Sequence, residues 1–217
     1  MQVLMRRPNS ALYFGLLALA GFLIFGVAIG VLMAEPAKVV GDRLAELTCL
    51  QIAFTPERYT AVFQSFPPDM QRAVLKLLLP GDVVFAWGYG LLLAGLIGLL
   101  AMRLPGEWQR WGAMIFWAPL LAATLDCVED VFLFAIGTQQ LAEPGVAIAA
   151  SLPLLAGIAA TLKYFALSIV TPAYGLAGIV KGLTFDRSII ALLLYLFLGL
   201  LLISMVLQPL QRVPLCF

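Results

Sequence analysis

Long apolar stretches alternate with short polar segments along most of this chain. Each of five stretches reaches the roughly 20 apolar residues that a helix needs to cross a bilayer. They cover about residues 11–33, 82–102, 111–137, 148–180 and 188–207. We therefore predict an all-α, polytopic helical membrane bundle, with a four-helix core and a fifth, C-terminal span. In this prediction residues 1–217 form a single membrane domain.

The first stretch follows Arg6 and Arg7, a pattern that also begins secretory signal peptides. Its apolar run is longer than the roughly 7–15 residues of a signal peptide, so we expect a retained membrane anchor. Small residues on this stretch suit close packing against another helix. They are Ala18, Gly21, Gly26 and Gly30.

Residues 34–81 form a long segment outside the predicted spans, and their pattern is not that of a flexible loop. Thr55 and Pro56 are typical of a helix N-cap and first helical position. Two prolines at 67 and 68 end that helix and begin another over about 69–79. We predict short amphipathic helices that cap the bundle on its external side. A lid or a partner-docking surface is the alternative.

Basic residues indicate which ends of the predicted spans face the cytoplasm. They precede the first span, separate the second from the third, and separate the fourth from the fifth. The residues are Arg6, Arg7, Arg103, Arg110, Lys181 and Arg187. This alternation predicts a protein of the inner (plasma) membrane with a cytoplasmic N-terminus and an external C-terminus.

Composition predicts the lipid bilayer as the main partner. Hydrophobic residues make up 63% of the chain and charged residues 12%, against about 25% charged residues in soluble domains. The net charge of +1 gives no basic surface for nucleic acid. The chain has no histidine, which excludes Ser-His catalysis and histidine metal sites. Enzyme motifs are also missing, so we assign no catalytic residue, no metal ligand and no cofactor.

The segment TLDCVEDVFLF, residues 124–134, places three carboxylates inside the third predicted span. Asp126, Glu129 and Asp130 have the i, i+3, i+4 spacing that puts side chains on one face of a helix. Charged side chains are costly in hydrocarbon, so we expect this face to meet the bundle interior or a wet cavity.

Polar residues on two other spans lie at a matching depth. Lys163, inside the fourth span, is expected to pair with Asp126 or Glu129. Asp82, at the start of the second span, adds a carboxylate at the outer edge, and Tyr89 adds a hydroxyl two turns further in. The predicted polar cluster therefore joins the second, third and fourth spans.

The charges of this cluster do not balance, because three or four acids face one lysine. Like charges packed in a low dielectric cannot all ionise. Either one carboxylate is protonated, or a cation enters, or Arg72 or Lys76 reaches down from the cap.

The three cysteines are too scattered for a thiolate metal cage. Cys49 and Cys216 both fall on the external side of the predicted topology, where disulfides persist. A disulfide between them is therefore one alternative, and two free thiols are the other. Cys127 is expected to be an inert core residue.

The order of these motifs resembles a loosely defined group of small bacterial multi-pass membrane proteins of uncharacterised function. The resemblance rests on LQIAFTPERYTAVFQSF at 50–66, on D-x-x-F-x-x-x-Y at 82–89, and on LDCVED at 125–130 before an intramembrane lysine. The group has L-D-x-x-E-N, so Asp130 stands where asparagine is usual, and Gln51 stands where an acid is frequent. The resemblance covers roughly residues 10–182 and implies a four-span core, with no activity attached.

Two roles fit this sequence. The first is a non-catalytic scaffold or accessory subunit of a membrane complex, with another membrane protein or a second copy of the chain as its partner. The second is a proton- or cation-coupled carrier, or a lipid-phase small-molecule binder, built on the acidic face. A third, an intramembrane enzyme with Asp or Glu as general acid and base, has no substrate motif to support it.

Overall fold

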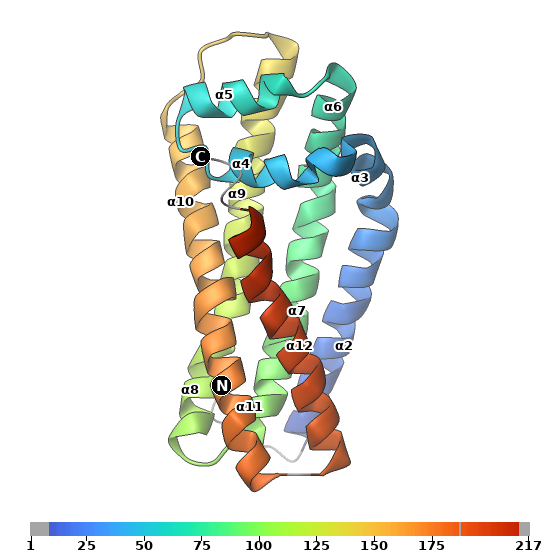
Figure 1. The fold of residues 1–217 in the computed structure, drawn as a ribbon, viewed down its shortest axis with the longest axis vertical. Helices are drawn as coiled ribbons and strands as arrows, with labels where there is room; N and C mark the ends of the chain where they lie inside the picture. The colour runs from blue at the N-terminus through green and yellow to red at the C-terminus, as the bar shows by residue number, and fades with distance from the viewer. Residues whose placement is uncertain (1–8, 187, 213–217) are drawn as a thin grey trace.

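The computed structural model describes residues 9–186 and 188–212, with the backbone alone at 44, 45, 205, 206 and 208–212. Every regular element in these residues is helical. Figure 1 shows long helices that run lengthwise and antiparallel, with short helices across one end. The long ones are α2 (Ser10–Val27) with η1 (Ala28–Leu32), η3 (Leu77–Asp82) with α7 (Val83–Met102), α9 (Trp117–Ala142), α10 (Ser151–Phe165) with η4 (Ala166–Val170) and α11 (Thr171–Phe185), and α12 (Ile189–Arg212).

Three continuous helical runs within the described residues are long and apolar enough to cross a membrane. They are Ser10–Leu32, Pro68–Met102 and Ser151–Phe185. Helix α9 has 26 residues, and at about 1.5 Å per residue it is also long enough, but it carries the three carboxylates. The apolar part of α12, Ile189–Ser204, is shorter. Membrane crossings by α9 and α12, and thus the count of four spans plus one, stay predictions.

Two predicted helix boundaries differ from the structure. The third stretch does not begin one helix at 111, because α8 (Glu107–Ile115) ends before α9 starts at Trp117. The second span does not begin afresh at 82 either, because α6 (Pro68–Lys76) continues through η3 into α7 with a kink. Leu79 leaves helical geometry there, next to Pro80, whose ring nitrogen cannot donate a helical hydrogen bond.

Helices α2 and α7 approach until their backbones nearly touch, and glycine makes this possible. A Cβ added at Gly21 would lie 2.2 Å from the backbone nitrogen of Leu92, and one at Gly95 would lie 2.5 Å from that of Ala18. By contrast, a Cβ at Gly26 or Gly30 would meet nothing within 4 Å. The predicted small-residue face is therefore used at Ala18 and Gly21 only. Gly26 and Gly30 lie five and nine residues after Gly21 and so point away from α7, although α2 and α7 still approach closely at Phe25 and Gly88.

The short helices form a packed cap at the upper end of the bundle (Figure 1). They are α3 (Ala34–Val40), η2 (Gly41–Glu46), α4 (Leu47–Gln51), α5 (Pro56–Ser65) and α6. The Thr55 hydroxyl accepts a hydrogen bond from the Arg58 amide, which confirms the predicted N-cap of α5. The buried Tyr59 hydroxyl donates to the Leu133 carbonyl of α9 at 2.9 Å, and burial raises the pKa of this hydroxyl. This contact fixes the cap to the bundle.

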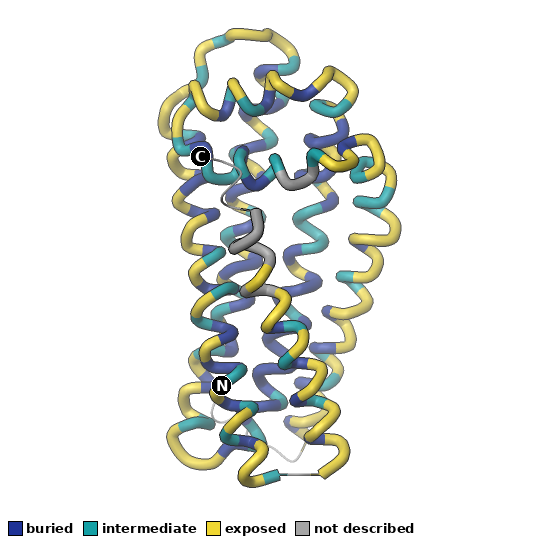
Figure 2. The backbone as a smooth tube through the Cα atoms, in the orientation of Figure 1, coloured by how far each residue is buried: buried dark blue, intermediate teal, exposed yellow. Residues whose placement is uncertain are grey.

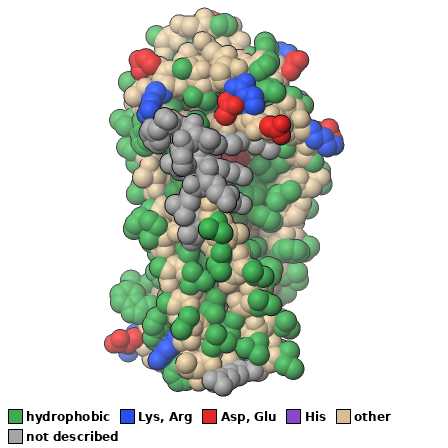
Figure 3. All heavy atoms as spheres, viewed as in Figure 1, with side chains coloured by type: hydrophobic (Ala, Val, Ile, Leu, Met, Phe, Trp, Pro, Cys, Tyr) green, Lys and Arg blue, Asp and Glu red, His purple; other side chains and the backbone are tan. Residues whose placement is uncertain are grey.

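The surface separates into apolar and charged zones. Figure 2 shows exposed residues along the outside of the long helices, and Figure 3 shows charged side chains gathered at the cap and at the opposite end, with hydrophobic side chains between them. Val31 and Ile189 are 68% and 77% exposed. At the end opposite the cap, Arg103 forms an ion pair with Asp186. This zoning suits a solvent of hydrocarbon flanked by water.

Candidate functional site

Helix α9 presents its three carboxylates to the bundle interior, as the spacing predicts. Asp126 is 4% exposed, and Glu129 and Asp130 are 0% exposed. Between them Cys127 is half-buried and Val128 is 42% exposed. The side chains that lie off the acidic face are thus the ones that face outward, so the 3.6-residue period of α9 determines the arrangement.

Lys163 of α10 is the positive centre of this polar cluster, which we define as Asp82, Tyr89, Asp126, Glu129, Asp130 and Lys163. Its Nζ donates to Asp126 Oδ1 at 2.5 Å and lies 2.6 Å from Glu129 Oε2. The Lys163 side chain is 5% exposed. The predicted buried Asp/Glu/Lys cluster is therefore present, and one amine contacts carboxylates on two successive turns of α9.

Helix α7 and the kinked segment before it complete the cluster. The Tyr89 hydroxyl donates to Asp126 Oδ2 at 2.8 Å, so both oxygens of Asp126 have partners. Asp82 is half-buried and lies at the junction of η3 and α7. One carboxylate oxygen each from Asp82, Asp126 and Asp130 lies within 4.8 Å of the others, an arrangement able to hold a metal ion. All three acids were predicted to belong to one cluster, and the structure adds that one oxygen of each approaches the other two this closely.

Asp130 differs from the other buried acids because nothing described in the structure neutralises it. Both of its oxygens are buried and have no hydrogen-bond partner among the described residues. The Glu129 oxygens also lack hydrogen bonds of good geometry, yet Glu129 keeps its ion pair with Lys163. A buried carboxylate without a partner is strongly unfavourable when ionised. The cluster is sealed around Lys163 and unsatisfied at Asp130.

The cap does not supply the missing charge. Arg72 pairs with Asp69 through an ion pair whose side chains are 58% and 84% exposed, and Lys76 is also exposed. The expectation that one of them reaches down is therefore not met, since both side chains lie on the outer face of α6. Of the three ways to balance the charges, protonation of a carboxylate and entry of a cation remain.

Tyr164 is a further member of this region that sequence reasoning missed. Its hydroxyl donates to Gln51 Oε1 of α4 at 2.6 Å, and the Lys163 Nζ lies 5.0 Å from the centre of its ring. The contact ties α10 to the cap directly beside the buried lysine. Its position next to Lys163 was the available signal, but the Gln51 partner is 113 positions away.

The cysteines stay outside this cluster. Cys127 is a free cysteine, half-buried on α9. Cys49 is half-buried on α4, while Cys216 lies outside the described residues, so the bridge between them stays a prediction.

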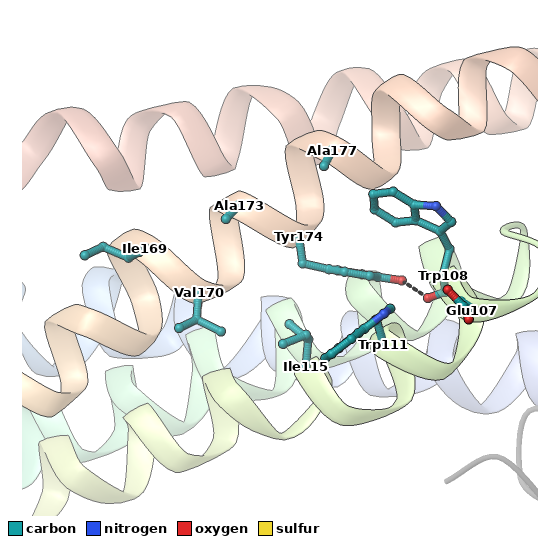
Figure 4. Close-up of a pocket in the computed structure, with 9 residues that line it drawn as sticks. All are labelled: Glu107, Trp108, Trp111, Ile115, Ile169, Val170, Ala173, Tyr174 and Ala177. Atoms are coloured by element: carbon teal, nitrogen blue, oxygen red, sulfur yellow. Dashed lines mark hydrogen bonds between the residues drawn. The ribbon is translucent and has the colours of Figure 1, made fainter.

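A groove of about 590 Å³ lies at the end of the bundle opposite the cap, between α8 and the η4–α11 segment. Figure 4 shows Tyr174 reaching across it, and its hydroxyl donates to the Trp108 carbonyl at 2.9 Å. Trp111 on the same groove is 55% exposed. Its lining is mostly apolar, and tryptophan and tyrosine here suit the inner membrane interface predicted for this end.

No protein-family model, no curated protein and no solved structure matches this chain.

Proposed function

We propose that this chain is a multi-pass protein of the inner (plasma) membrane, with its N-terminus in the cytoplasm and α9 and α12 crossing together with the three apolar runs. The apolar zone between two charged ends supports this. Arg103 precedes α8, Arg110 lies within it, and Lys181 lies near the end of α11, so described basic residues gather at the end opposite the cap. That end faces the cytoplasm under the positive-inside rule.

Within the membrane we propose the role of a non-catalytic scaffold or accessory subunit. The observation that carries it is the sealed contact of Lys163 with Asp126 and Glu129, joined by Tyr89. These contacts connect α7, α9 and α10 without leaving the lysine or its two acids accessible. Such a clamp fixes how the helices are aligned along their length. An apolar interface fixes this alignment only weakly in a membrane, because lipid tails are as apolar as the side chains.

A second role, a proton- or cation-coupled carrier or lipid-phase binder, is favoured by Asp130. Its unpaired oxygens give the cluster a negative charge beyond what Lys163 balances. Intramembrane carboxylates without a fixed partner are typical of proton and ion pathways. The scaffold is the first proposal because the cluster is closed around its lysine.

The test compares Asp126→Asn and Glu129→Gln with the surface variant Asp69→Asn. Full-length protein is purified in detergent, its assembly state is measured by light scattering, and cation or proton flux is followed in proteoliposomes under a pH gradient. A scaffold gives no flux, and both cluster variants lose thermal stability and assembly while Asp69→Asn keeps them.

A carrier gives pH-dependent flux in the wild type, which Glu129→Gln abolishes while the protein remains folded. That result would replace the scaffold by the second role. Cluster variants that match the wild type in stability, assembly and flux would contradict both.

A further inference from the structure

Three carboxylates meet at the junction of η3, α7 and α9. Because one oxygen each from Asp82, Asp126 and Asp130 lies within 4.8 Å of the other two, a point exists that is no more than about 2.8 Å from all three. Two of these residues are successive-turn neighbours on α9, and the third comes from the kinked segment that precedes α7. The kink at Leu79 places Asp82 at the start of α7, where it faces the acidic side of α9.

Asp130 independently indicates that something occupies this point. Its side chain is fully buried, it reaches toward the other two carboxylates, and neither of its oxygens has a hydrogen-bond partner among the described residues. Nearly all buried polar groups in folded proteins have a partner, so an unpaired carboxylate aimed at two others is a strong exception. An ionised Asp130 would therefore need a positive partner at this point.

The nearby cations of the described chain are already committed elsewhere. Lys163 contacts Asp126 and Glu129, and Arg72 and Lys76 are exposed on the cap. A proton on Asp130 would remove one negative charge but would leave the other three acids of the cluster facing one ammonium. An ion at the central point satisfies all three carboxylates together.

We propose that Asp82, Asp126 and Asp130 bind a divalent cation of the size of Ca²⁺. Calcium takes oxygen ligands at about 2.3–2.6 Å, which a small closure of the trio provides, whereas Mg²⁺ needs about 2.0–2.1 Å and a stricter octahedron. With four carboxylates and one ammonium in the cluster, a divalent ion leaves one excess negative charge in place of three. Water completes the coordination shell.

The half-buried Asp82 gives the ion its route. The other two ligands are 4% and 0% exposed, so exchange passes Asp82 on the cap side of the bundle. The inference goes beyond the scaffold role and would give the second role its ligand. The Lys163 clamp does not need the ion, so failure of this inference leaves the proposed function standing.

The experiment uses the full-length protein in detergent, stripped with a chelator and titrated with CaCl₂. Equilibrium dialysis with radioactive calcium measures binding, and a heating series measures the unfolding midpoint. We expect one saturable site per chain. Asp130→Asn lowers the calcium affinity by at least about tenfold, since even outer partners of metal ligands contribute this much. The matched control Asp69→Asn, exposed on the cap, binds like the wild type.

The unfolding midpoints of the wild type and Asp130→Asn give a second readout, because calcium is expected to reverse their order. Without calcium, Asp130→Asn has the higher unfolding midpoint because it lacks the unpaired charge. With saturating calcium the wild type gains stability through binding and overtakes it. If Asp130→Asn does not fold, Asp82→Asn replaces it, because its half-buried position tolerates the change. The inference is overturned by a wild type without saturable calcium binding, by a ligand variant that binds calcium as the wild type does, or by tighter binding of Mg²⁺ than of Ca²⁺.

Discussion

Replacing Lys163 with methionine tests how much a buried ion pair contributes to the free energy of unfolding, in comparison with an exposed pair. Methionine keeps a long unbranched side chain and removes the charged ammonium together with its hydrogen-bond donors. Two ion pairs in this protein have the same length and opposite surroundings. Lys163 lies 2.6 Å from Glu129 with side chains 5% and 0% exposed, and Lys38 lies 2.6 Å from Glu35 with side chains 70% and 79% exposed. Lys38→Met is therefore the matched control.

The expected magnitude follows from burial. Removing one partner of a buried ion pair costs about 3–5 kcal/mol, because the opposite charge stays buried without compensation. In Lys163→Met two carboxylates, Asp126 and Glu129, lose the amine that both contact. An exposed pair contributes at most about 1 kcal/mol, so Lys38→Met should be nearly neutral. At about 2–4 °C per kcal/mol, the unfolding midpoint of Lys163→Met falls by roughly 10 °C.

The assay heats each purified variant in detergent and measures the fraction that stays monodisperse on size exclusion. A rescue variant combines Lys163→Met with Asp126→Asn and Glu129→Gln. It removes the charges that the single change leaves behind, so it should recover most of the lost stability. Equal midpoints for Lys163→Met and Lys38→Met would refute the reasoning. A rescue variant no better than Lys163→Met would show that packing, not charge, caused the loss.

Two further predictions concern packing and the cap. Gly21→Ala should lower the free energy of unfolding by about 1–3 kcal/mol, because its Cβ would overlap the α7 backbone. A Cβ at Gly26 on the same helix meets open space, so Gly26→Ala should be neutral or stabilising by up to about 1 kcal/mol. A lower thermal unfolding midpoint for Gly26→Ala than for Gly21→Ala would contradict this prediction. Tyr59→Phe removes the hydrogen bond to the Leu133 carbonyl, which keeps its helical partner within α9, and should cost about 0.5–1.5 kcal/mol. Tyr13→Phe, whose side chain is 53% exposed, should cost nothing measurable. An equal effect of the two tyrosine changes on the unfolding midpoint would argue against the cap contact.

Several features of the fold follow from local sequence and are present in the structure. Thr55 caps α5 because its hydroxyl bonds to an amide three residues later, a contact that needs no tertiary partner. The acidic face of α9 follows from helical period alone. The expectation of a small-residue face on α2 succeeded at Gly21 and failed at Gly26, because Gly26 lies off the helix face that Ala18 and Gly21 share.

The polar cluster also combines features that the sequence predicted with features that depend on packing. The buried pairing of Lys163 with α9 was predictable, because the depth of each residue along an antiparallel pair of helices follows from counting. The grouping of Asp82 with Asp126 and Asp130 was also predicted, but the distances among their oxygens were not, because they depend on the kink at Leu79 and on how α7 packs against α9. The exposed positions of Arg72 and Lys76 depend in turn on how the cap packs.

The sequence alone determined that this chain is helical and apolar, and that three carboxylates share one face of a helix with a lysine at matching depth. These properties depend on composition and on the 3.6-residue period, which act within single segments. Only the tertiary structure decided that one lysine contacts both Asp126 and Glu129 while Asp130 lies near Asp82 and Asp126 without an ion pair to it. The physical reason is that charge compensation in a buried site acts over a few ångströms, and only the packing of distant segments sets those distances.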